Sequence, residues 1–250
     1  SAQQDPQLFA LAGESYMQSK DFDKAAEFFE KANTLLPENA ALHTALALSK
    51  LGQGNRESAI AELETAADLD EKSPRAGILL VMTHLQVKDF NKALKAVEEL
   101  EKDQPDSPLV QNLKGSIYVG MKDLGKARLV FEKALSLKQD YFPAISNLAR
   151  LDVQENKLEE AKKRFEAVIN RDKKHIQAMH ALAGIALSQN NKSEAIAWFE
   201  RASNENPNEI QPALQLGALY VQLQEGNKAL NLAKKLQGSF PDNLSVVELL

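Results

Sequence analysis

The chain has 250 residues, and 30 Lys and Arg against 35 Asp and Glu give it a formal net charge of −5. That charge is too mild for a surface that coats nucleic acid, which needs a basic stripe, so we expect no nucleic-acid partner. A content of 44% hydrophobic and 26% charged residues is typical of folded domains and argues against a disordered chain.

The absence of cysteines and of long apolar runs excludes further classes of protein. The sequence has no cysteine, which excludes a disulfide framework, thiolate zinc sites and a cysteine nucleophile within this chain. No apolar run approaches the ~18 residues that a membrane span requires, and no signal peptide is visible at Ser1. We therefore expect a soluble segment without a transmembrane helix, taken from a longer protein.

Alanine recurs every 34 residues along the chain without an insertion. The positions are Ala25, Ala59, Ala93, Ala127, Ala161, Ala195 and Ala229. Ala and Leu together supply 70 residues, whereas the strand formers Val, Ile and Thr supply 24, so the predicted fold class is all-α. This period indicates stacked pairs of helices, each about 14 residues long, whose small residues allow close backbone approach.

The period predicts one domain over 1–250. Its seven complete units are 6–39, 40–73, 74–107, 108–141, 142–175, 176–209 and 210–243, and 244–250 begins an eighth. Helix start signals agree: an N-cap before a first-turn proline occurs at Asp5, Ser73 and Ser107, and the second helices are predicted to be capped by Asp21, Asn55, Asp89, Asp123 and Asn191. No proline falls in the middle of a predicted helix.

Small and aromatic residues occupy fixed places in these units. The first helices carry Gly13 with Tyr16, Gly115 with Tyr118, and Gly217 with Tyr220; the second carry Ala25 with Phe29, Ala127 with Phe131, Ala161 with Phe165, and Ala195 with Phe199. On these residues the chain resembles a tetratricopeptide repeat (TPR) array. The signature Trp of the first helix is replaced by Phe9, His43, Gly77, Gln111, Ile145, Met179 and Ala213. The resemblance implies a right-handed α-solenoid of tandem helix-turn-helix repeats.

A narrower resemblance rests on residues 141–144, 147–152, 163–166 and 195–202, with 228–230 and 241–243. These segments are similar to the TPR-repeat lipoprotein of the bacterial PEP-CTERM/exosortase system. The resemblance implies a bacterial envelope lipoprotein on the periplasmic side, linked to exopolysaccharide production and protein sorting. Its lipidated cysteine and signal peptide would then lie upstream of Ser1.

The sequence contains no convincing catalytic or cofactor-binding motif. The segment from Gly120 to Ala127 matches most of the phosphate-binding loop motif, but it lacks the final Ser or Thr and no strand is predicted before it. A turn between two helices is therefore the favoured interpretation. His175 and His180 are five residues apart, off the spacing that places two imidazoles on one helix face. Trp198 is expected to pack against other side chains or lie at the surface. We therefore predict no enzyme activity, no cofactor and no metal site.

Function is expected on the concave surface, which in TPR proteins is lined by the second, fifth, ninth and twelfth residues of each first helix. Leu48, Ile78 and Met82 would form an apolar patch there, although each position could instead complete packing between helices. The candidate partner-binding residues are Thr44, Leu48, Arg75, Ile78, Met82, Asn112, Ser116, Ser146, Arg150 and His180.

Three hypotheses follow from this pattern. The first is a non-enzymatic scaffold that binds a protein or peptide segment in the groove. The second is that the array is the substrate-presenting arm of a larger enzyme, such as a glycosyltransferase, which the gene beyond Leu250 would reveal. The third is end-to-end self-association through the incomplete eighth unit, which would expose Leu244, Val247 and Leu250.

Overall fold

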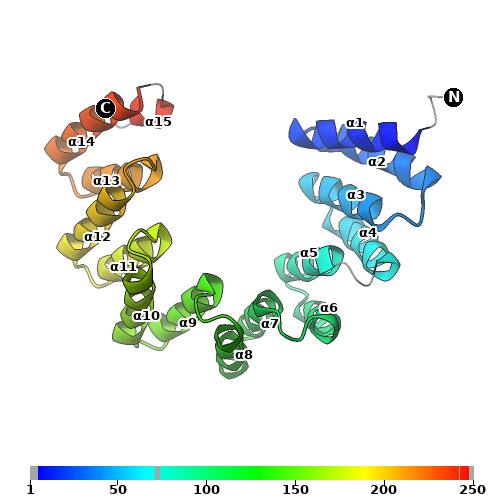
Figure 1. The fold of residues 1–250 in the computed structure, drawn as a ribbon, viewed down its shortest axis with the longest axis horizontal. Helices are drawn as coiled ribbons and strands as arrows, with labels where there is room; N and C mark the ends of the chain where they lie inside the picture. The colour runs from blue at the N-terminus through cyan, green and yellow to red at the C-terminus, as the bar shows by residue number, and fades with distance from the viewer. Residues whose placement is uncertain (1–4, 71–73, 242, 248–250) are drawn as a thin grey trace. The chain divides into compact units, whose positions relative to one another are not determined.

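The computed structural model describes residues 5–70, 74–241 and 243–247. These residues form helices and no strand, which confirms the predicted all-α fold. Figure 1 shows the helices in chain order. They are α1 (Pro6–Gln18), α2 (Phe22–Leu35), α3 (Ala40–Gly52), α4 (Arg56–Leu69), α5 (Pro74–Gln86), α6 (Phe90–Asp103), α7 (Pro108–Gly120), α8 (Leu124–Leu137), α9 (Phe142–Gln154), α10 (Leu158–Arg171), α11 (Ile176–Ser188), α12 (Lys192–Glu205), α13 (Ile210–Gln222), α14 (Gly226–Ser239) and α15 (Leu244–Val247).

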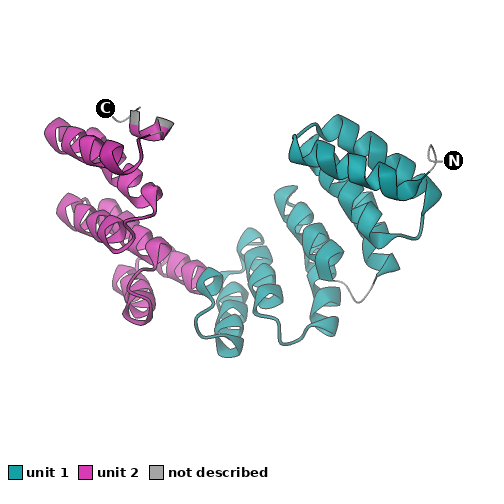
Figure 2. Ribbon diagram, turned by 45° about the horizontal axis from the view of Figure 1, so that its top comes forward, with its two compact units in different colours: residues 1–144 teal, residues 145–250 magenta. Residues whose placement is uncertain are grey.

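The chain divides into two compact units, residues 1–144 and residues 145–250 (Figure 2). In unit 1, each helix from α1 to α8 packs against the next helix in the sequence, and the same is true in unit 2 from α10 to α15. The expected single domain over 1–250 stays a prediction. The face expected to self-associate, with Leu244, Val247 and Leu250, lies outside the residues whose side chains the structure describes.

The predicted N-caps are confirmed wherever the structure describes them. Asp5 accepts a hydrogen bond from the Gln7 amide at 2.8 Å, and Ser107 accepts one from the Val110 amide. Second helices begin in the same way, with caps at Asp21, Asn55, Asp89, Asp123 and Asn191. Ser73 lies outside the described residues. These caps satisfy amide donors that have no partner inside a helix, so the local sequence determines where the helices start.

The periodic alanines form the seam of each hairpin. Ala25, Ala59, Ala93 and Ala127 are fully buried in unit 1, and so are Ala161 and Ala195 in unit 2. In the hairpins of α1 with α2 and of α7 with α8, the first helix has a glycine beside this seam that receives an aromatic ring from the second helix. A Cβ added to Gly13 would lie 2.7 Å from the Phe29 ring. Close helix approach therefore depends on the absence of a side chain at that point.

The turn between the two helices of each hairpin contains a residue with positive φ. These residues recur every 34 positions, at Lys20, Gly54, Lys88, Lys122, Asn156, Asn190 and Gln224. A left-handed backbone strains any residue with a Cβ, and only Gly54 avoids that strain. Six of the seven turns thus place a side chain where glycine is favoured.

The positive φ angles predict that two substitutions in these turns change the stability of the protein in opposite directions. Gly54→Ala should lower the free energy of unfolding by about 1 kcal/mol, because φ at this position is +81°. Lys122→Gly should raise it by up to about 1 kcal/mol, because relief of the strained φ outweighs the added freedom of the unfolded chain. Chemical denaturation of the two variants would measure both changes. A destabilised Lys122→Gly variant would show that the lysine side chain stabilises its turn.

Candidate functional site

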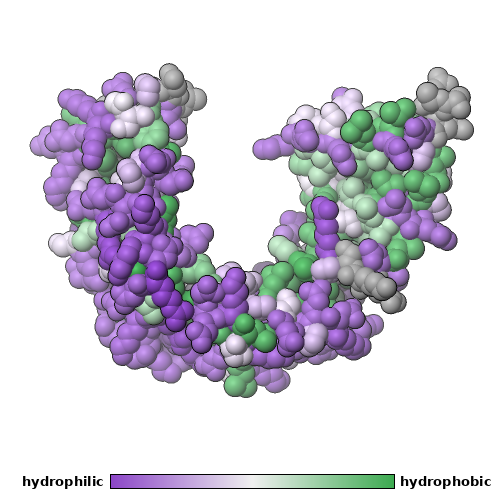
Figure 3. Space-filling model, viewed as in Figure 1, coloured by the Kyte–Doolittle hydropathy of each residue, from purple (hydrophilic) through white to green (hydrophobic). Residues whose placement is uncertain are grey.

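The first helices of unit 1 carry the apolar part of the predicted binding surface. Met82 of α5 is 45% exposed and Leu109 of α7 is 37% exposed, whereas Leu48 of α3 and Ile78 of α5 are half-buried. Ile78 packs against the core cluster that contains Val81 and Val97. Met82 is therefore the predicted residue that offers the most apolar surface. Figure 3 shows hydrophobic residues at the surface over the N-terminal helices of unit 1.

Two of the predicted polar residues of unit 1 direct their hydroxyl groups into their own helices. Thr44 is buried, and its hydroxyl donates to the Ala40 carbonyl at 2.8 Å. Ser116 is half-buried and donates to the Asn112 carbonyl at 3.0 Å. A Ser or Thr side chain commonly makes this bond to the carbonyl four residues earlier in a helix. Thr44 consequently presents no polar group to a partner.

The other two predicted polar residues of unit 1 are placed differently. Arg75 lies in the first turn of α5, where its side chain is exposed. Asn112 of α7 is half-buried and already takes part in contacts within the chain. Arg75 is thus the predicted residue of unit 1 that offers a charged group to solvent.

In unit 2 the predicted residues belong to α9 and α11. Arg150 is exposed, and its guanidinium donates to the Asn147 side chain, while Ser146 is half-buried. His180 is half-buried and lies against the Phe199 ring, with 5.2 Å between the ring centroids. Its Nε2 atom is buried and has no hydrogen-bond partner within the described residues. Burial lowers the pKa of His180, so the ring is uncharged at neutral pH.

A polar cluster between α6, α7 and α8 was not predicted from the sequence. The Glu101 carboxylate accepts hydrogen bonds from Lys114 Nζ at 2.6 Å, from Gln111 Nε2 at 2.8 Å and from Lys133 Nζ at 2.9 Å. The bonds from Lys114 and Gln111 contribute most to lowering the pKa of Glu101 to about 2. The three donors are 10, 13 and 32 residues away, so no local motif reveals the cluster.

A cavity of about 810 Å³ in unit 1 was also missed. It is lined by α4, α5 and α6 and includes His84, Glu64 and Lys95. Among the described residues, no group of three or more His, Asp or Glu side chains could hold a metal ion. The segment that resembles a phosphate-binding loop forms the turn between α7 and α8, where Lys126 pairs with Asp123 at 2.9 Å.

Within the described part of the chain, no helix is both long and apolar enough to cross a lipid bilayer. The half-buried Trp198 of α12 has the guanidinium carbon of Arg201 5.4 Å from its ring centroid. A cation over an indole face is a common stabilising contact, so this tryptophan already has a partner inside the chain.

Comparison with known proteins finds the same repeat. The tetratricopeptide repeat family model matches residues 16–66, 50–117, 118–184 and 153–215. A search of curated proteins gives no match.

Solved structures share the fold. A tetratricopeptide repeat protein from Parabacteroides merdae has a TM-score of 0.66 at 18% identity, covering 98% of this chain and 97% of that chain. For pilF of Pseudomonas aeruginosa the TM-score is 0.60 at 18% identity, with 88% of this chain and 96% of that chain covered. Yeast Tom70 gives 0.61 at 22% identity, with 86% of this chain and 46% of that chain covered. At such identities these structures show a common fold and nothing about partners.

Proposed function

The chain belongs to the tetratricopeptide repeat family, and from this premise we propose that it is a non-enzymatic scaffold that binds a segment of a partner protein. The binding surface of unit 1 is formed by the first helices α3, α5 and α7, with Leu48, Arg75, Ile78, Met82, Asn112 and Ser116. In unit 2 the corresponding residues are Ser146, Arg150 and His180.

The observation that carries this proposal is the exposure of Met82. Its neighbours on α5, Val81 and Thr83, are buried, whereas 45% of the Met82 side chain faces solvent. A methionine is flexible and polarisable, and it adapts to partners of irregular shape. Burying this side chain against apolar groups of a partner removes apolar surface from water, which favours association.

Site-specific photocrosslinking tests the proposal. A benzophenone amino acid at Met82 should form a discrete covalent adduct in the source cells, and mass spectrometry would identify the attached protein. The matched control is Leu129 of α8, which is 66% exposed but belongs to a second helix. Equal labelling from both positions, or none from Met82, would contradict the proposed surface.

The identified partner then allows a direct affinity measurement. Met82→Glu should weaken binding at least about tenfold, because the new carboxylate would lose its hydration in an apolar contact. Leu129→Glu should leave the affinity unchanged. Calorimetric titration of both variants measures the two effects. A Met82→Glu variant that binds as tightly as the wild type would show that the partner binds elsewhere.

The narrower proposal is an envelope lipoprotein linked to exopolysaccharide production and protein sorting. Its support is the resemblance of residues 141–144, 147–152, 163–166 and 195–202 to the exosortase-system TPR lipoprotein. Fractionation of the source cells tests it, because a lipid-anchored protein would sediment with membranes and enter the detergent phase. Recovery of the full-length protein in the aqueous fraction would rule out the anchor.

A further inference from the structure

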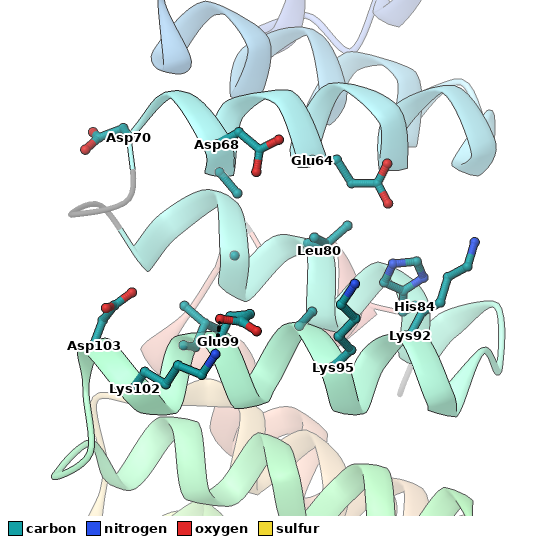
Figure 4. A pocket seen from close by; sticks show the side chains of 14 residues that line it. Glu64, Asp68, Asp70, Leu80, His84, Lys92, Lys95, Glu99, Lys102 and Asp103 are labelled. Atoms are coloured by element: carbon teal, nitrogen blue, oxygen red, sulfur yellow. Dashed lines mark hydrogen bonds and ion pairs between the residues drawn. The ribbon is translucent and has the colours of Figure 1, made fainter.

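The cavity of unit 1 lies between two second helices. In Figure 4, α4 passes along one side, α6 along the other, and α5 forms the floor. Gly77 and Leu80 of α5, together with Ala96 and Leu100 of α6, supply an apolar lining. Its volume of about 810 Å³ falls within the range of small-molecule sites in proteins.

The third repeat has small side chains at two positions that line this cavity, Gly77 and Ala96. The fourth residue of its first helix is Gly77, whereas the other six repeats have Phe9, His43, Gln111, Ile145, Met179 and Ala213. A second difference involves the eleventh and twenty-third residues of a repeat. Lys50 and Glu62 form an ion pair at 2.8 Å, and Asp152 and Arg164 form one at 2.6 Å. In the third repeat these residues are His84 and Ala96, so position 96 supplies no charged side chain to pair with the imidazole.

His84 lines this end of the cavity and has one buried ring nitrogen without a hydrogen-bond partner within the described residues. Its side chain is 2% exposed, and Nδ1 has no hydrogen-bond partner within the described residues. Leaving a buried nitrogen unsatisfied costs stability, and a ligand atom that bonded to it would recover that loss. An imidazole nitrogen can donate or accept according to its tautomer, so it would serve an amide or a carboxylate.

Charged side chains line both walls. Those of α4 are Glu64 and Asp68, whereas α6 supplies residues of both signs, which are Lys92, Lys95, Glu99, Lys102 and Asp103. Glu64 and Asp68 extend from α4 toward the cavity, and Lys95 extends from α6 on the opposite side (Figure 4). None of these three residues forms an ion pair within the part of the chain that the structure describes. Lys102, by contrast, is paired with Glu99 at 2.6 Å. A ligand with both an ammonium and a carboxylate group would complement Glu64, Asp68 and Lys95.

We propose that this cavity is a binding site for small zwitterions with an apolar side chain, namely amino acids or short free peptides. The ammonium group lies toward Glu64 and Asp68, the carboxylate toward Lys95, and the apolar side chain on Leu80 and Leu100. In a peptide ligand, His84 donates to or accepts from the peptide group. The site is separate from the partner-binding surface, because Met82 and Arg75 do not line it.

Leucine, leucyl-leucine and trileucine are the probes that test the site. Titration of the isotope-labelled full chain should shift the His84 imidazole resonances, assigned by their loss in His84→Gln. N-acetyl-leucyl-leucine amide, which lacks both charges, should bind at least tenfold more weakly than leucyl-leucine. Absence of any His84 shift with all three probes would overturn the proposal. Equal binding of the capped peptide would overturn the charge recognition on which it rests.

Two variants locate the ligand in the cavity. Ala96→Leu fills the space and should abolish binding, and Lys95→Gln should weaken it at least tenfold without altering the core. Glu57→Gln is the matched control, because Glu57 is exposed on α4 and does not line the cavity. Should Ala96→Leu fail to fold, Lys95→Gln still decides the matter. Undiminished binding by Lys95→Gln, or by a folded Ala96→Leu, would overturn the assignment.

Discussion

Replacing Gly115 by leucine is expected to lower the free energy of unfolding by about 3 kcal/mol or more. A Cβ at this position would lie 2.3 Å from the Phe131 ring, which is fully buried. Neither the ring nor the α7 backbone has space to move away, because the hairpin of α7 and α8 is closely packed there. Gly115→Ala should cost about 1 to 3 kcal/mol. Thermal and urea denaturation followed by circular dichroism would measure both losses.

Gly184 provides the control for this prediction. It also lies inside a first helix, α11, but a Cβ there would meet nothing within 4 Å. Gly184→Ala should therefore raise the free energy of unfolding by about 0.5 to 1 kcal/mol, since alanine is the better helix former. If Gly115→Ala were as stable as the wild type while Gly184→Ala behaved as expected, the close approach of α7 and Phe131 would be incorrect.

Removal of the Glu101 charge is expected to cause the second largest loss of stability. Glu101→Gln should lower the free energy of unfolding by about 2 kcal/mol, because Lys114 loses its closest carboxylate while 84% of its side chain is shielded from solvent. Glu99→Gln is the matched control on α6. Its pair with Lys102 is as short, at 2.6 Å, but exposed, so the loss should stay below about 0.5 kcal/mol.

The same cluster predicts acid sensitivity. The folded-state pKa of Glu101 is about 2, below the usual value of 4.5, so the folded state binds its proton more weakly than the unfolded state does. The stabilisation is therefore complete above pH 4.5 and is lost as the pH falls through about 2. After allowance for solvent screening we expect about 1 to 2 kcal/mol. Denaturation of wild type and Glu101→Gln across this pH range should show the two stabilities converging, and parallel curves would contradict the prediction.

The sequence by itself determined the architecture. The 34-residue alanine period predicted the hairpins, and caps such as Asp21 and Asp123 predicted the starts of second helices, which the structure confirms. These features are local, because a cap bonds to an amide two or three residues away and a hairpin closes within one period. The same reasoning overlooked the cap of α11, where His175 Nδ1 accepts from the Ala178 amide. Histidine is not among the preferred capping residues, so the pattern gave no signal.

Only the tertiary structure decided which residues of the candidate surface face solvent. Thr44 and Met82 occupy expected lining positions, yet Thr44 is buried and Met82 is exposed. Side-chain exposure depends on the rotation of each helix against its neighbours, which the period does not specify to within one residue. The Glu101 cluster and the cavity beside His84 arise in the same way. Both join residues from several helices, so they exist only once the helices have packed.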